Sequence, residues 1–334
     1  MGKNVLSILG SPIFKWGIMY FSNRAILFSL LFTGCAQPSP EVSANQSAST
    51  KVMLEGKTEG RLIEGYSLVD IPAGSFMMGC TKLDTNCSPA EKPSHKVTLT
   101  RSFSMMKTEV TRALYKKVTG KSPGFCFDCD DSCPVEMVSW LDAVFFANEL
   151  SELEGITPCY SIHEEDKDKY GYPYIQWKDK ECMGWRLPTE AEWEFAARGG
   201  QEHFFSGGAQ LEEVAWFEEN SAVQNTHRPH KVASKKANGY GLYDMTGNVA
   251  EWVWDFDLRY DKKNNPKGLL GEEVGYPSAE AQQDPISEEK SNFHIYRGGS
   301  FLSHRIGSRL STRGMMGADL SFKFIGFRLV KTQK

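Results

Sequence analysis

The segments of this chain that show a helical or strand period are all short. Residues 111–118 fit a helix that Gly120 stops. Residues 189–198 fit a helix that begins with a capping box, Thr189 with Glu192, and ends at two glycines. Residues 96–100 alternate polar and apolar side chains, as in a half-buried strand. Short elements joined by long loops predict an irregular α+β fold and argue against a helical bundle or a coiled coil.

A third helix is predicted after Ser139, because Ser139 and Asp142 have the spacing of a capping box. Apolar residues then follow at helical spacing: Leu141, Val144, Phe145 and Ala147. Two long polar segments, 160–181 and 255–292, show no period. We expect both to be irregular loops.

The composition fits one loop-rich domain. Thirty glycines and eight tryptophans accompany a hydrophobic fraction of 40%, which is enough for a packed core. No repeat of about 20–50 residues is visible, which argues against a solenoid or a propeller. No linker interrupts the chain after residue 55, so residues 61–332 are expected to form a single domain. A formal net charge of −4 argues against nucleic acid as a partner.

Residues 1–34 are predicted to be a signal peptide. They carry three basic residues and no acidic one, and an apolar run at 25–34 is too short to span a bilayer. Cys35 follows directly, and this arrangement resembles the lipoprotein box of bacteria, in which the cysteine is acylated. The alternative is an ordinary signal peptide with a chance cysteine. Met19 is an alternative start.

Residues 35–60 are predicted to be a flexible tether. Residues 36–50 are rich in Ser, Pro, Ala and Gln and have no apolar period. The membrane is therefore an expected partner, through the lipid anchor. Ala36 stands where an Asp commonly retains bacterial lipoproteins at the inner membrane. We expect a place in the cell envelope, at the outer membrane and facing the periplasm or the exterior.

Eight cysteines in an exported chain predict disulfides. Local spacing suggests the pairs Cys80–Cys87, Cys129–Cys133 and Cys159–Cys182. Beside Cys35, this leaves Cys126 as a possible free thiol. An alternative is a metal site made by Cys126, Cys129 and Cys133, although a second ligand pair at zinc-finger spacing is missing.

Five segments in this order resemble one family. They are IPAGSFMMG at 71–79, GWRLPTEAEWEFAAR at 184–198, NGYGLYDMTGNVAEW at 238–252, RGGSF at 297–301 and GFRLV at 326–330. Together they resemble the formylglycine-generating enzymes, also called sulfatase-modifying factors, over residues 62–331. The resemblance implies a single irregular domain related to the C-type lectin fold, with bound calcium in many members.

The resemblance implies a calcium loop at residues 244–251. Asp244 and Glu251 would supply carboxylate oxygens, and Gly247 and Val249 would supply backbone carbonyls, which are the ligands that Ca²⁺ takes. The alternative is a turn whose acidic residues only cap and solvate it. The second calcium loop of the family is not recognisable near residues 216–230.

The resemblance also locates the catalytic segment and shows a departure from it. The oxidases carry two cysteines five residues apart, which bind Cu(I) and exchange with the substrate cysteine. Here Ser303 and Ser308 stand at those positions, while Ser300, His304 and Arg305 still match. A neutral hydroxyl does not bind Cu(I) as a thiolate does, so copper is not expected. Residues 184–190, in contrast, are expected to form the end of a strand and the cap of a helix. Burial of Trp185, Leu187, Trp193 and Phe195 explains most of this motif.

Three functions remain open. The first is an exported binding module, stabilised by calcium, for an envelope peptide, glycan or protein. The second is an enzyme that modifies a peptide or metabolite by other chemistry, or a residual formylglycine-generating oxidase. The third is a structural or assembly partner. Whether the chain is an enzyme stays open, because it resembles an oxidase family while Ser303 and Ser308 replace the catalytic cysteine pair. The one close histidine pair, His227 and His230, has no apparent third metal ligand.

Overall fold

In the computed structural model, the described residues are 63–81, 84–125, 129–167, 171–257, 279–287 and 291–333. The predicted signal peptide, the whole predicted tether with Cys35, and Cys126 lie outside them. Within these residues, no helix has the length and apolar character needed to cross a membrane.

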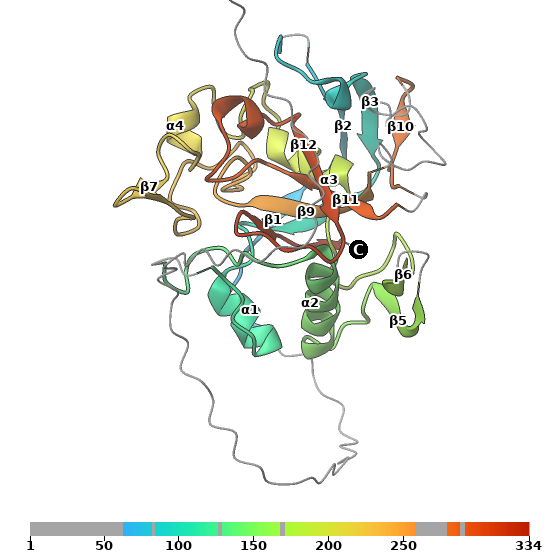
Figure 1. The fold of residues 1–334 in the computed structure, drawn as a ribbon. Coiled ribbons are helices and arrows are strands. Elements are labelled where there is room, and N and C mark those ends of the chain that lie inside the picture. The colour runs from blue at the N-terminus through green and yellow to red at the C-terminus, as the bar shows by residue number, and fades with distance from the viewer. Residues whose placement is uncertain are drawn as a thin grey trace, which may run out of the picture. The chain divides into compact units, whose positions relative to one another are not determined.

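A four-stranded sheet lies at the centre of the described domain (Figure 1). Its strands, in spatial order, are β12 (Arg313–Gly317), β11 (Phe293–Arg297), β9 (Ala250–Phe256) and β13 (Ile325–Phe327). β13 pairs with β9 in parallel, and the other pairs are antiparallel. All residues of β9 but the last are buried, including the two acidic residues Glu251 and Asp255.

Two three-stranded sheets flank this centre. One contains β1 (Leu68–Ile71), β4 (Phe103–Met106) and β14 (Val330–Thr332), in that order. The other contains β10 (Gln282–Gln283), β3 (His95–Leu99) and β2 (Gly74–Met78), so that β2 lies at an edge. The strand predicted at residues 96–100 is therefore present as β3.

The three predicted helices are confirmed, and a short fourth helix joins them. They are α1 (Arg112–Thr119), α2 (Trp140–Leu153), α3 (Glu190–Arg198) and α4 (Leu211–Val214). The capping boxes at Ser139 and Thr189 are both formed, and Gly120 and Gly199 end α1 and α3 with positive φ angles of 70° and 59°. Local sequence chemistry thus sets where these helices begin and end.

The prediction of an irregular loop at 160–181 was wrong. This segment forms an antiparallel hairpin of β5 (Tyr160–Lys167) and β6 (Pro173–Trp177). The outer half of β5 is exposed, so its side chains lack the alternation that marks a strand. The small remaining elements are β7 (Ala222–Val223), β8 (Thr226–His227) and the 3₁₀ turns η1 (Pro89–Glu91) and η3 (Arg305–Ser308).

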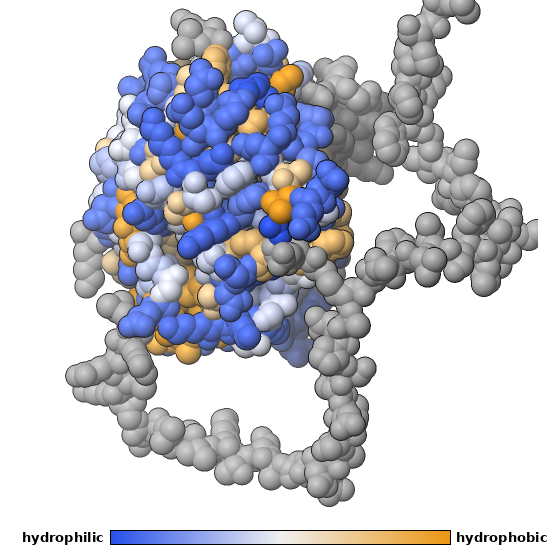
Figure 2. All heavy atoms as spheres, turned by 90° about the vertical axis from the view of Figure 1, so that its left-hand side faces the viewer, coloured by the Kyte–Doolittle hydropathy of each residue, from blue (hydrophilic) through white to orange (hydrophobic). Residues whose placement is uncertain are grey.

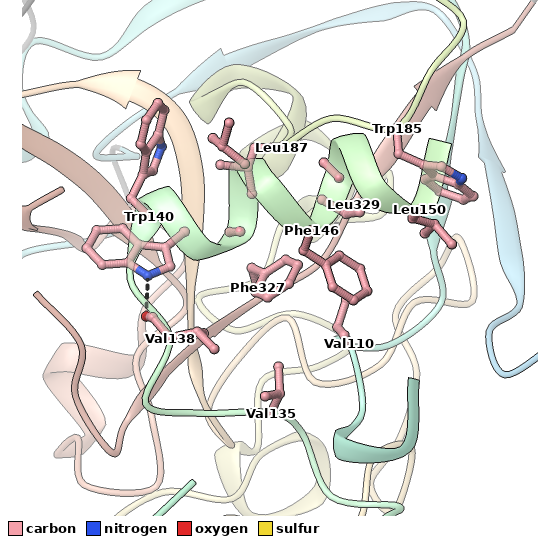
Figure 3. Close-up of a cluster of buried hydrophobic side chains, with 14 of the residues drawn as sticks. Val110, Val135, Val138, Trp140, Phe146, Leu150, Trp185, Leu187, Phe327 and Leu329 are labelled. Carbon is pink, nitrogen blue, oxygen red and sulfur yellow. Dashed lines mark hydrogen bonds between the residues drawn. The ribbon is translucent and has the colours of Figure 1, made fainter. Parts of the chain in front are cut away.

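The main hydrophobic core lies between α2 and the central sheet, and Figure 3 shows its centre. Trp185 and Leu187 are fully buried in this core, and Trp193 and Phe195 are buried in a second core around α3, as predicted. The face of α2 differs from the prediction, because Phe146 is buried while Phe145 is 36% exposed.

All three predicted disulfides are present. Cys80–Cys87, Cys129–Cys133 and Cys159–Cys182 have Cα–Cα distances of 5.9, 6.1 and 5.5 Å. The last one joins the two ends of the β5–β6 hairpin.

Candidate functional site

The segment that replaces the catalytic region of the resembled oxidases is a tight loop after β11. Gly298 and Gly299 turn the chain with positive φ angles of 93° and 68°. A Cβ atom on Gly299 would lie 2.7 Å from the carbonyl oxygen of Gly307, so only glycine lets the loop lie this close to η3. This packing fixes the backbone on both sides of Ser303 and Ser308.

Both serine hydroxyls are bonded to their own loop. Ser303 Oγ accepts a hydrogen bond from the backbone N–H of Ser300 at 2.9 Å. Ser308 is fully buried, and its hydroxyl donates to the carbonyl oxygen of His304 at 3.2 Å. A serine nucleophile needs a base that takes its proton. Ser308 instead donates its proton to a carbonyl oxygen.

The side chains of His304 and Arg305 in this loop are exposed to solvent. His304 pairs with Glu218, and its side chain is 80% exposed. Arg305 pairs with Glu212 on α4. Figure 2 shows that the face carrying α4 and β7 is mostly hydrophilic, with apolar residues in scattered groups. Exposed ion pairs contribute little to stability, so these residues tie the loop loosely to α4.

Glu251, one of the predicted calcium ligands, is held by a buried arginine. Arg328 donates from Nε and Nη2 to the two carboxylate oxygens of Glu251 at 2.7 and 2.6 Å. Trp193 Nε1 donates to the same carboxylate at 2.8 Å. Arg328 also donates to the carbonyl oxygens of Met106, Lys107 and Tyr243. The ion pair of Arg328 and Glu251 therefore links β9, the end of β4 and the loop before Asp244.

Asp244, the other predicted carboxylate ligand, keeps an oxygen without a partner. Its Oδ2 accepts from the backbone N–H of Ala233 at 2.7 Å, and a protonated Glu109 can donate to the Asp244 carboxylate. When Glu109 is ionised, the buried Oδ1 of Asp244 has no N–H or O–H donor among the described residues. The same holds for Oε2 of buried Glu109, whose Oε1 accepts weakly from Val249 N–H at 3.5 Å. Glu109 had not been predicted, because a lone acidic residue before a helix gives no signal in the sequence.

Burial acts strongly on this acidic cluster, which we define as Glu109, Asp244 and Glu251. It raises the pKa of Asp244 to about 6, with a further contribution from Glu251. It also raises the pKa of Glu109 well above its ordinary value, and the charge of Asp244 adds to this. Three carboxylates face one guanidinium, so the cluster favours an added positive charge. Two unpartnered carboxylate oxygens fit a hard cation such as Ca²⁺.

The predicted backbone ligands lie in the same loop. Gly247 has a φ angle of 79°, and a Cβ atom there would lie 2.3 Å from the carbonyl oxygen of Trp216. Val249 is fully buried beside Glu109, to which its N–H points. The loop is thus closely packed, and it places Val249 next to the acidic cluster, while Gly247 packs against Trp216.

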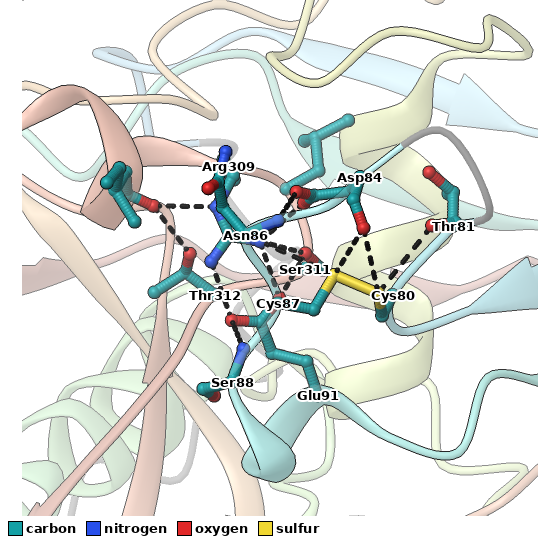
Figure 4. Close-up of polar contacts among 12 residues, drawn as sticks. Cys80, Thr81, Asp84, Asn86, Cys87, Ser88, Glu91, Arg309, Ser311 and Thr312 are labelled. Atoms are coloured by element: carbon teal, nitrogen blue, oxygen red, sulfur yellow. Dashed lines mark hydrogen bonds and ion pairs between the residues drawn. A yellow bond between two sulfur atoms is a disulfide. The ribbon is translucent and has the colours of Figure 1, made fainter.

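A second group of possible ligands, Asp84, Cys87 and Glu91, is occupied by the protein itself (Figure 4). Cys87 is in a disulfide, and Arg309 binds Asp84 at 2.5 Å and Glu91 at 2.7 Å. These contacts attach the Cys80–Cys87 loop to the segment after η3. We interpret the group as a structural ion pair.

His227 and His230 also bind within the protein. His227 Nδ1 lies 3.0 Å from the hydroxyl of Ser221, and His230 Nε2 lies 2.9 Å from the carbonyl oxygen of Ser221. The His230 ring stacks on Trp216, with 3.8 Å between ring centroids. The two rings therefore pack around one residue in a loop.

Comparison with known proteins connects this geometry to one family. The family described as sulfatase-modifying factor enzyme 1-like domain matches residues 57–333. The chaperone protein LppX of Paenibacillus barcinonensis is 35% identical over 231 residues, 62% of this chain and 78% of that protein. The formylglycine-generating enzyme of Mycobacterium tuberculosis is 28% identical, over 79% of this chain and 97% of that protein.

Solved structures agree with this assignment. Treponema denticola variable protein 1 has a TM-score of 0.66 and 27% identity, and the match covers 80% of this chain and 95% of that one. PvdO from Pseudomonas aeruginosa has a TM-score of 0.59 and 24% identity, and the match covers 80% and 94%. The second similarity concerns the fold alone.

Proposed function

This chain belongs to the sulfatase-modifying factor enzyme 1-like family, and we propose that it is a member that binds polypeptides and does not oxidise them. The proposal rests mainly on the identity and the hydrogen bonding of Ser303 and Ser308. They stand where the resembled oxidases have cysteines, and their hydroxyls bond to the backbone of their own loop. The scaffold of the family is retained around a site that has no thiolate at these two positions.

The similarity to a chaperone supports binding of polypeptide rather than of glycan. A chaperone holds chains that expose apolar segments, and it needs no reacting group. The test measures, by light scattering, how fast a reduced, unfolded protein (the client) aggregates with and without the mature chain, residues 35–334. We expect suppression at stoichiometric amounts.

The absence of oxidation is tested separately. The mature chain is incubated in air with Cu(I) and a peptide containing Cys-x-Pro-x-Arg, and the cysteine is followed by mass spectrometry. We expect no bound copper and no conversion. Formation of formylglycine would contradict the proposal and would indicate a residual oxidase.

Restoring both cysteines is expected to restore copper binding. In the Ser303→Cys/Ser308→Cys variant, two thiolates replace two hydroxyls, and soft thiolates select Cu(I). We expect the copper content, measured by elemental analysis, to rise from none to about one ion per chain. The single variants are the matched controls and should bind far more weakly.

We also propose that the chain is anchored in the outer membrane by acylated Cys35. This proposed location is supported by Ala36, which stands where an Asp commonly causes retention at the inner membrane, and by the polar residues that follow it. Labelled palmitate should enter the wild-type chain and be absent from Cys35→Ala, and fractionation should recover the wild type with outer membranes.

Calcium is proposed as a stabilising ion of the acidic cluster. Asp244 and Glu109 would hold it with their unpartnered oxygens, and the carbonyls of Gly247 and Val249 and the Glu251 carboxylate are the other proposed ligands. Three ionised carboxylates beside one arginine leave an excess of negative charge in the buried cluster, and the calcium ion would neutralise it.

Removal of calcium is therefore expected to lower thermal stability. An ion at 100 times its dissociation constant adds about 2.7 kcal/mol to the free energy of unfolding. We expect EDTA to lower Tm, added Ca²⁺ to restore it, and Asp244→Asn to remove most of the response. An equal Tm in EDTA and in Ca²⁺ would argue against the site.

A further inference from the structure

A cavity of about 640 Å³ lies beside strand β2, and neither Ser303 nor Ser308 lines it. One wall is formed by residues 73–77 and the other by residues 200–204, which follow α3. Side chains of a strand alternate between its two faces. The lining includes four consecutive residues of β2, Gly74 to Met77, and Ala73 just before them, so the cavity runs along the backbone of that strand and not only over one face. We call it the β2 groove.

The strand on this wall has an open edge. In the order β10-β3-β2, β2 is the last strand, and β3 is its one strand partner within the described parts of the chain. In an antiparallel pair, every second residue points its N–H and C=O away from the partner. The β2 groove therefore offers backbone donors and acceptors at the spacing of a further strand.

Aromatic rings line the groove. Phe76 lies 5.4 Å from Phe195, and Phe195 lies 5.9 Å from Tyr240, measured between ring centroids. Gly74 permits this arrangement, because a Cβ atom there would lie 2.9 Å from Phe195 Cζ. The two rims are also apolar, since Met77 is 50% exposed and Phe204 is 40% exposed. These surfaces suit large apolar side chains of a ligand.

The charge at the groove is mostly neutralised, with one exception. Arg198 is paired with Glu194 and also donates to the carbonyl oxygen of Gly79. Glu202 is exposed, and no ion pair to it is found among the described residues. A ligand with a basic residue beside its apolar part would complement this carboxylate.

From these observations we propose that the β2 groove binds an extended peptide that adds to β2 as a strand. The peptide carries aromatic or large aliphatic residues at alternate positions and a basic residue next to them. Backbone hydrogen bonds would give the affinity, and the rings would select the side chains. This inference rests on the proposed function, since it assigns the polypeptide-binding surface.

The test uses the mature chain and a fluorescent nine-residue peptide of alternating Phe and Thr with a Lys at each end. Binding is measured by fluorescence anisotropy. Two further peptides are N-methylated, one on the odd-numbered amides and the other on the even-numbered amides. Strand addition uses one edge of the peptide, so we expect one of the two to lose binding and the other to retain it. Equal binding of both would overturn strand addition.

The position of the groove is tested by variants of exposed residues. We expect the Met77→Lys/Phe204→Ser variant to weaken binding by about 10-fold or more, because it removes apolar contact from both rims. Glu202→Lys should weaken binding of the Lys-flanked peptide and leave a Ser-flanked peptide unaffected. The matched control is Leu320→Ser, since Leu320 is 46% exposed and does not line the groove.

The outcomes separate this inference from the proposed function. If aggregation is suppressed and peptide binds equally to wild type and groove variants, the binding function stands and the groove assignment is wrong. If the client protein aggregates unchanged and no peptide binds, both are wrong. Circular dichroism of each variant would show that a loss of binding does not come from unfolding.

Discussion

Replacing Arg328 by methionine is expected to lower the free energy of unfolding by about 3–5 kcal/mol. Arg328 is fully buried and is the guanidinium that binds both oxygens of Glu251. Without it, the acidic cluster would contain three carboxylates and no cation from the protein. The carbonyl oxygens of Met106, Lys107 and Tyr243 would also lose a donor. Urea denaturation followed by tryptophan fluorescence measures the change.

Two controls show whether the buried charge is the cause. Arg101→Met removes an arginine from an exposed ion pair with Glu181 and should change stability by less than about 0.5 kcal/mol. The double variant Glu251→Gln/Arg328→Met removes one carboxylate charge together with the guanidinium and should recover part of the loss. If the single variant Arg328→Met were as stable as the wild type, our account of the cluster would be wrong.

Replacing Trp252 by alanine is expected to cost about 3–5 kcal/mol, the range for large aromatic residues in a core. Trp252 lies in β9, is fully buried, and donates from Nε1 to the carbonyl oxygen of Val138 at 3.0 Å. The change would leave a cavity between α2 and the central sheet. Thermal unfolding followed by circular dichroism, with urea denaturation for the free energy, gives the measurement.

Two further variants divide the effect of Trp252 into packing and hydrogen bonding. Trp252→Phe keeps a ring but leaves the Val138 carbonyl without its donor, so it should lose less than the alanine variant. Phe145→Ala removes a ring from the same core helix at its exposed side and should stay within about 0.5 kcal/mol of the wild type. Similar losses for Phe145→Ala and Trp252→Ala would contradict the assigned core.

Features that depend on neighbouring residues could be predicted from the sequence. The capping boxes at Ser139 and Thr189 need only the next three residues, and both are formed. The disulfides followed from short spacings for the same reason. The β5–β6 hairpin was missed, because its outer half is solvent-exposed on both faces and so has no hydrophobic alternation.

The candidate sites depend on residues that are distant in the chain. Glu109 belongs to the acidic cluster and Arg328 neutralises part of its charge, yet more than 200 residues separate Glu109 from Arg328 along the sequence. The β2 groove likewise joins residues 73–77 to residues 200–204. No local pattern marks such pairs. The resemblance to the family located Asp244, Glu251, Ser303 and Ser308, and the structure added their partners.

The order in which the strands are joined also has a consequence for biosynthesis. β13 and β14 come from the last ten described residues, and they pair with β9 and β4, which are made much earlier. Arg328 lies between them and neutralises Glu251 in β9. A nascent chain that lacks this final stretch has two incomplete sheets and a buried acidic cluster without its arginine. Folding of the domain is therefore completed only once the segment that contains β13 and β14 has been made and has joined β9 and β4.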